Sequence, residues 1–98
     1  MKWLPIFFLF LFSAQTGAFD EGDLKKLKAT NACVKCDLSG TNLSGENLKG
    51  ANLFRANLTR ANLTDADLTN AIMMKAIVQG AIFCRTIMPD ETLNNSGC

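Results

Sequence analysis

Leucine recurs at every fifth position through the middle of the chain. The residue before each leucine is Asn or Asp, and the residue two before it is small in all but one repeat, where it is Glu46. The seven leucines are Leu38, Leu43, Leu48, Leu53, Leu58, Leu63 and Leu68. The register then continues with Met73, Val78, Phe83 and Met88 at the leucine position. The chain therefore holds eleven five-residue repeats between Cys36 and about Asp90.

A period of five does not give one buried row on a helix or on a flat strand. On a helix the leucines would advance by about 140° per repeat, and on a strand they would alternate between faces because five is odd. A chain that turns a corner every five residues can point the leucine and the small residue inward on every side. Four such sides close a square coil of twenty residues, and coils stack about 4.8 Å apart through backbone hydrogen bonds. The sequence thus predicts an all-β coil with a core of alternating large and small side chains.

The repeats A-N-L-F-R, A-N-L-T-R, A-N-L-T-D and A-D-L-T-N at residues 51–70 resemble the pentapeptide-repeat family, A-(D/N)-L-x-x. The resemblance covers residues 33–90 and implies a right-handed quadrilateral β-helix, here of under three coils. The flanks resemble those of small exported members, with an F-D-x-x-D-L helix, a C-x-x-C-D-L start, a T-x-M-P-D exit and a terminal Cys98. This resemblance implies no established activity.

The first eighteen residues have the pattern of a secretory signal peptide. Lys2 precedes a largely apolar stretch at residues 3–12, and small residues then lead to a cleavage site expected after Ala18. The stretch is shorter than the roughly twenty apolar residues that span a membrane. An uncleaved apolar anchor is the alternative. We therefore expect an exported protein, periplasmic or secreted, without stable membrane insertion after cleavage.

A short N-terminal capping helix is expected next. Asp20 or Asp23 can cap a helix that runs to about Lys28 and covers the first coil. Glu46 falls at an inward position of that coil, where burying a carboxylate is costly. We expect Glu46 to reach solvent or a lysine of the helix. The predicted organisation is a signal peptide at 1–18, the capping helix at 19–32, the repeats at 33–90 and a C-terminal tail at 91–98.

The four cysteines would lie in an oxidising compartment if the chain is exported. Cys33 and Cys36 take inward positions across one corner, and the ends of such a turn are close enough for a disulfide. Cys84 should point outward, where a tail ending in Cys98 could reach it. A thiol–disulfide exchange role for the C-x-x-C pair is the alternative, although no βαβ pattern or histidine favours it. A zinc site is disfavoured because the two pairs lie on the order of 12 Å apart.

The last coil has isoleucine where earlier coils have an outward Asn or Asp. These residues are Ile72, Ile77, Ile82 and Ile87, and Phe54 stacked near Met74 adds apolar surface beside Arg55 and Lys75. Outward apolar side chains call for a cover, and the tail is too short to wrap all four sides. We therefore expect these six residues, the four isoleucines with Phe54 and Met74, to form an interface with a second copy or with another protein.

Charge and composition exclude several functions. Residues 19–98 hold nine basic and nine acidic side chains, which suits neither a nucleic-acid binder nor an acidic DNA mimic. Histidine is absent, and the sequence has no Gly-rich phosphate loop and no G-x-S-x-G motif. We predict a non-catalytic exported structural or interaction module with no cofactor, no metal site and no nucleic-acid partner. The wider family also suggests a DNA-mimicking topoisomerase-binding protein, but that function needs a long acidic prism in the cytosol.

Overall fold

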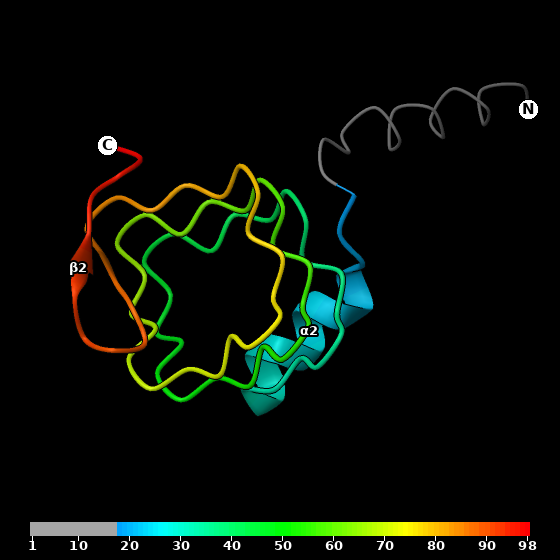
Figure 1. Cartoon of the computed structure of the whole chain (residues 1–98). Coiled ribbons are helices and arrows are strands. Elements are labelled where there is room, and N and C mark those ends of the chain that lie inside the picture. The colour runs from blue at the N-terminus through cyan, green and yellow to red at the C-terminus, as the bar shows by residue number, and fades with distance from the viewer. Residues whose placement is uncertain (1–17) are drawn as a thin grey trace, which may run out of the picture.

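The computed structural model describes residues 18–98. The predicted signal peptide, except for its last residue, lies outside the described residues. The regular elements are the helix α2 (Glu21–Thr30) and the two-residue strands β1 (Thr86–Ile87) and β2 (Leu93–Asn94). Between α2 and β1 the chain winds into a square coil (Figure 1).

Successive coils are joined by parallel backbone bridges between residues twenty apart. The bridges run from Ala32↔Asn52 and Asp37↔Asn57 through to Asp67↔Ile87. In a representative pair, the Leu58 N–H donates to the Ile77 carbonyl at 2.7 Å, and the Ile77 N–H donates to the Ala56 carbonyl at 2.9 Å. The twenty-residue spacing is the one that the five-residue repeat predicts for a four-sided coil.

Each corner is a tight turn that the repeat sequence builds by itself. In one example, the Ala61 N–H donates to the Leu58 carbonyl at 3.0 Å, and Arg60 before it has a φ of 59°. A positive φ at this place is the mark of a type II turn. The Asn57 side-chain oxygen accepts from the Thr59 N–H at 3.0 Å, and it also accepts from the Thr59 hydroxyl. The Asn or Asp before each leucine therefore stabilises the next corner, as Asx turns do.

The core is the row of inward side chains along the coil axis. The central leucines are buried, and the small residues two positions before them leave room for the leucines of neighbouring sides. Thr41 and Thr86 occupy two of the small positions and are buried with their hydroxyls donating to the carbonyls of Leu38 and Leu63. These hydrogen bonds explain why threonine is tolerated there.

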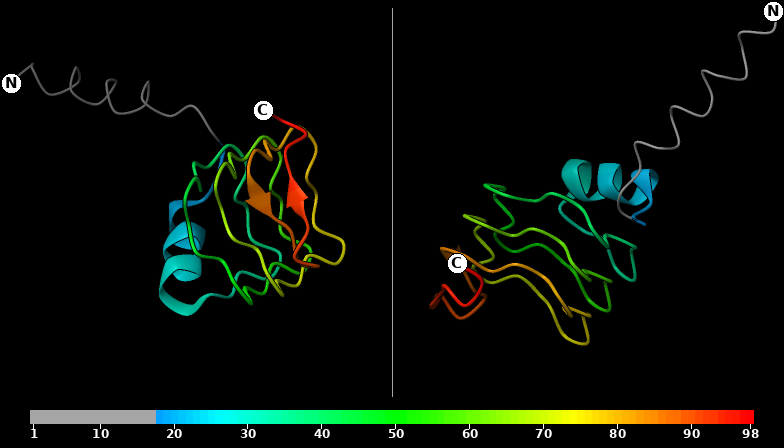
Figure 2. Two further views of the ribbon diagram at one scale, coloured as in Figure 1. Left: turned by 90° about the vertical axis from the view of Figure 1, so that its left-hand side faces the viewer. Right: turned by 90° about the horizontal axis from the view of Figure 1, so that it is seen from above.

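The helix α2 lies across one end of the coil (Figure 2). Asp20 is its N-cap, with the side chain accepting from the Gly22 and Asp23 N–H groups at 2.8 and 3.1 Å. Leu27 is buried against the first coil. The Asp20 N–H donates to the Asp37 carbonyl at 3.0 Å, and the Asp37 N–H donates to Asp23 Oδ2 at 2.9 Å. The helix thus takes up backbone groups that the first coil would otherwise leave unpaired.

The helix runs two residues beyond the Lys28 end that the sequence predicted. It ends at Thr30 because Asn31 adopts a left-handed conformation, φ 62°, and its N–H donates to the Leu27 carbonyl at 2.8 Å. The Asn31 side chain then donates to the Lys49 carbonyl at 2.9 Å, which ties the end of the helix to the coil.

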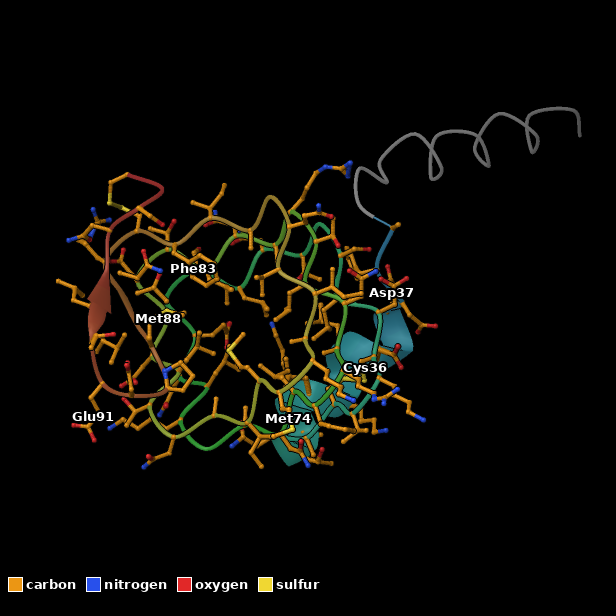
Figure 3. All side chains as sticks on the ribbon, in the orientation of Figure 1. Cys36, Asp37, Met74, Phe83, Met88 and Glu91 are labelled. Atoms are coloured by element: carbon orange, nitrogen blue, oxygen red, sulfur yellow. A yellow bond between two sulfur atoms is a disulfide. The ribbon has the colours of Figure 1, made fainter. Side chains whose placement is uncertain are left out.

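The hairpin of β1 and β2 lies at the other end of the coil (Figure 2). The strands pair antiparallel, with Thr86 opposite Asn94 and Ile87 opposite Leu93. Farther along the tail, the Gly97 N–H donates to the Phe83 carbonyl at 2.7 Å. Figure 3 shows Phe83 and Met88 inside the outline of the coil and Glu91 outside it. The tail therefore covers one part of this end, and the sides formed by residues 71–80 have no segment of the tail beside them (Figure 1).

Candidate interaction surfaces

The C-x-x-C pair forms a disulfide inside the first coil. Cys33 and Cys36 are bonded, with Cα atoms 5.2 Å apart, and both side chains are buried. Thiol–disulfide exchange requires an attacking thiolate to reach one sulfur of the bond. The burial of both sulfur atoms, beneath α2, gives such a thiolate no access in the folded protein. This geometry is typical of a structural disulfide.

The second disulfide joins the coil to its own tail. Cys84 and Cys98 are bonded, with Cα atoms 4.8 Å apart. Cys84 points outward from the repeat but is buried by the tail that returns over it. The Arg85 N–H donates to the Asn95 side chain at 2.8 Å, which adds a polar contact beside the bond. All four cysteines are thus bonded, and no free cysteine remains in residues 18–98.

Glu46 lies where a lysine of α2 can reach it. Its side chain is half-buried at the edge of the first coil, and Oε2 is 3.7 Å from Lys28 Nζ. The carboxylate is partly exposed and also pairs with a lysine of the helix, in agreement with the expectation that it would reach solvent or such a lysine. Its partial exposure and its single lysine neighbour give it no sign of a catalytic acid.

The coil end opposite α2 exposes apolar side chains. Ile72, Ile77 and Ile82 are 47%, 49% and 40% exposed, whereas Ile87 is half-buried beside β2. Met74 is 63% exposed. Of the six predicted interface residues, four are exposed in the last coil: three lie on the sides that the tail leaves free, and Ile82 lies beside Gly97 of the tail. We call Ile72, Met74, Ile77 and Ile82 the end patch.

Core positions also open at this end. Val78 and Met73 take the central position that leucine fills in the coil beneath, yet Val78 is exposed and Met73 is only half-buried. In the coil beneath, the N–H groups of Leu53 and Leu58 donate to Ile72 and Ile77. Among the described residues, no carbonyl accepts from the corresponding N–H groups of Met73 and Val78. The end patch thus adjoins an open backbone edge, which sequence reasoning did not identify.

Phe54 lies apart from the end patch, in the coil beneath. Its ring is half-buried, and the Arg55 guanidinium carbon lies 5.4 Å from the ring centroid, within the range of a cation–π contact. Phe54 therefore contributes less apolar surface to an interface than the sequence predicted, because its own neighbour covers part of it.

Two ion pairs join charged side chains of successive coils. Arg85 Nε donates to Asp65 Oδ1 at 2.7 Å, and Lys49 Nζ lies 3.7 Å from Asp67 Oδ2. The hydrogen bond from Arg85 lowers the pKa of Asp65 below its ordinary value of 3.8. Hydrogen bonds from Thr69, first the hydroxyl and then the N–H, similarly lower the pKa of Asp67.

Another corner carries three cations and no acid. Lys35, Arg55 and Lys75 occupy the same corner position in successive coils, each with a φ near 60°. Together with Ile77 they line an open depression of about 360 Å³. We call these three residues the cationic column. Sequence reasoning placed Arg55 beside Lys75 but did not extend the column to Lys35, although counting twenty residues back would have found it.

Comparison with known proteins places this geometry in a family. The sequence profile of pentapeptide repeats (8 copies) matches residues 33–70 and 51–88. The chain belongs to the pentapeptide-repeat family. This membership implies a right-handed quadrilateral β-helix, in agreement with the twenty-residue spacing of the bridges. A comparison with curated protein sequences gave no match.

Two solved pentapeptide-repeat structures are similar to parts of the chain. One is Rfr23 from the cyanobacterium Cyanothece 51142, at 35% identity over 51% of this chain, with a TM-score of 0.41. The other is HetL from Nostoc sp. strain PCC 7120, a protein involved in heterocyst differentiation regulation, at 25% identity over 64% of this chain, with a TM-score of 0.31. The chain spans 41% and 40% of the lengths of these two proteins.

The pentapeptide-repeat coil accounts for the inward residues, so a function must come from the ends or the outward rows. Within residues 18–98, no three metal-ligating side chains of the His, Cys, Asp or Glu type gather closely enough to hold an ion. The same part of the chain contains no helix with the length and apolar character needed to cross a membrane. The end patch and the cationic column are the two outward features that repeat packing does not explain.

Proposed function

We propose that this pentapeptide-repeat protein is an exported, non-catalytic interaction module. It is a short right-handed β-helix of under three coils, capped by α2, closed by two disulfides and joined to a second copy through its C-terminal end. The observation that carries the proposal is the open edge beside the end patch, where apolar side chains and unpaired backbone N–H groups lie together.

The contrast between the two ends supports this assignment. At the N-terminal end, α2 buries Leu27 and supplies partners for the backbone of Asp37. At the C-terminal end, the hairpin performs the same task for residues near Phe83 and Ile87 but not for those near Met73 and Val78. A second copy, packed end to end, would bury the end patch in a self-complementary contact. The near balance of acidic and basic residues leaves no strong repulsion between copies.

The alternative functions have less support. Exchange chemistry at Cys33 and Cys36 requires sulfur atoms that an incoming thiolate can reach, and these are buried. Topoisomerase binding by DNA mimicry requires a continuous acidic surface, whereas Asp65 and Asp67 are each paired with a cation. The buried disulfide and the neutralised acids therefore favour a structural and interaction role.

The interface is tested by replacing Ile72 and Ile77 with asparagine, the residue that this position holds in the coil beneath. Sedimentation equilibrium should show association of the parent protein and a monomer for the double variant, with unchanged far-UV circular dichroism. The control is Val34→Thr, which removes an exposed apolar side chain at the first coil and should leave association unchanged. A monomeric parent, or unchanged association of the double variant, would contradict self-association.

Export and cysteine oxidation are tested together by intact mass. Protein from the exported fraction of the producing cells is alkylated without reduction. A mass equal to residues 19–98 minus four hydrogens, with no alkylated cysteine, is expected. A full-length or alkylated species would overturn export or the disulfides.

A further inference from the structure

The cationic column is an unneutralised line of charge along one corner of the coil. Lys35, Arg55 and Lys75 follow one another at the spacing of stacked strands, about 4.8 Å per coil. None of the ion pairs found among residues 18–98 involves any of the three. The acid on the neighbouring row, Asp37, accepts instead from the N–H and hydroxyl of Ser39, at 3.1 and 2.7 Å. Like charges at this spacing repel one another, so the arrangement disfavours the folded chain by itself.

The backbone at this corner adds a second cost. All three residues of the column have a left-handed backbone conformation, with φ of 60°, 60° and 61°. Residues other than glycine seldom adopt this conformation. Each of the other three corners includes glycine in at least one coil, for example Gly40 and Gly80 around Arg60. The column is therefore the one corner of the described coil where every residue combines a charged side chain with a strained backbone conformation. Glycine at these positions would remove both the backbone strain and the charge repulsion.

The surroundings of the column define what it can bind. Its residues and Ile77 line the depression of about 360 Å³, and the row next to it is apolar, with Phe54 and the exposed Met74. The depression is therefore lined mainly by cations, with one apolar side chain in it and apolar surface beside it. Because the cations lie in a line along the coil axis, they match an extended chain of anionic groups better than a flat anionic membrane.

We propose that the cationic column binds an acidic oligosaccharide laid along the coil axis. A chain of uronic-acid sugars carries one carboxylate per ring, so that successive carboxylates can face successive coils. The apolar faces of the rings can pack on Ile77 and on the row of Phe54 and Met74. Arg55, in the centre, supplies a planar group that can donate two hydrogen bonds to one carboxylate. Because Met74 and Ile77 also belong to the end patch, an oligosaccharide bound here and a second copy would compete for these two side chains, and the titration is therefore done at a concentration where the protein is monomeric.

The experiment is calorimetric titration of the oxidised protein with trigalacturonate, and with the neutral maltotriose and inorganic tripolyphosphate for comparison. Trigalacturonate should bind, and its affinity should fall as salt is raised. Arg55→Asn should weaken binding about tenfold, since one charge-assisted contact is lost. Asparagine suits the backbone there, because Asn31 and Asn70 hold the same left-handed conformation in this chain.

The matched control is Arg60→Asn. Arg60 lies in the same coil, at the same place in the repeat and with nearly the same φ, but between two glycines. It should change the affinity for trigalacturonate less than twofold. Lys75→Asn, a second column variant, should weaken binding as Arg55→Asn does.

Four results would overturn the proposal. The first is no binding of trigalacturonate, and the second is an equal loss of affinity in the Arg55 and Arg60 variants. The third is equal affinity for maltotriose, which would remove the role of charge. The fourth is tighter binding of tripolyphosphate, whose charges lie closer together, because this would show that the spacing of the sugar rings does not match the column.

Discussion

Arg85 donates from Nε to Asp65 Oδ1 at 2.7 Å and from Nη2 to Asp65 Oδ2 at 3.1 Å, across two successive coils at one corner. The two residues are twenty apart, so the coil itself stacks the guanidinium above the carboxylate. This two-point contact is the strong form of an ion pair. It shows that opposite charges in one corner column can tie coils together, the reverse of the arrangement in the cationic column.

The Asp65–Arg85 pair predicts a loss of stability in acid. Hydrogen bonding by Arg85 lowers the pKa of Asp65 in the folded protein below its ordinary value of 3.8. A group with a lowered folded pKa contributes stability above its unfolded pKa and loses that contribution as the pH falls through the folded pKa. Asp65→Asn should therefore lower the melting temperature slightly at pH 6, and this effect should shrink as the pH is lowered below 3.8. A difference in melting temperature that persists unchanged at pH 2 would contradict this origin, and high salt at pH 6 should reduce it.

The core positions differ in energy between the middle and the end of the coil. Leu58 is fully buried, and Val78 takes the same position twenty residues later but is 38% exposed. In protein dilute enough to be monomeric, Leu58→Ala should lower the free energy of unfolding by about 2–5 kcal/mol, whereas Val78→Ala should cost less than about 1.5 kcal/mol. Urea unfolding measures both changes. Equal losses in the monomer would contradict the exposure of Val78, and a cost of Val78→Ala that rises with protein concentration is expected from an end-to-end contact.

The sequence predicts the coil well because the repeat is local. Each corner is held by contacts within one five-residue segment. At residues 57–61, for example, the Thr59 N–H donates to the Asn57 side chain and the Ala61 N–H donates to the Leu58 carbonyl. The inward positions follow from the same short-range register, and a helix cap at Asp20 or Asp23 follows from local capping chemistry. The path of the tail does not, because the pairing of Ile87 with Leu93 depends on a return of the chain that no repeat encodes. That return decides which part of the predicted interface is covered.

Glu46 is the one charged residue at the small, inward position of a repeat. The residues at the same place in the next two coils are Ala66 and Thr86. It is held at the edge of the coil by Lys28 at 3.7 Å, and both side chains are partly exposed. A pair of this kind contributes little, so Glu46→Ala should change the free energy of unfolding by less than about 1 kcal/mol. Denaturant unfolding of Glu46→Ala and of Lys28→Ala tests this. A larger loss for Glu46→Ala than for Lys28→Ala would show a role beyond the ion pair.

The Cys84–Cys98 disulfide should dominate the stability of the C-terminal end. The bond joins residues 14 apart, and closing a loop of this size contributes about 3 kcal/mol in the chain-entropy description. Replacing both cysteines by alanine should lower the free energy of unfolding by about that amount and speed hydrogen exchange at the Gly97 and Ile87 N–H groups. The control is Cys33→Leu with Cys36→Ala, which restores the residues that the repeat uses at those positions. That variant loses a four-residue loop closure, about 2 kcal/mol by the same relation, but keeps apolar side chains in the core. If the control were the more damaging change, the first coil and not the tail would be the part that depends on its disulfide.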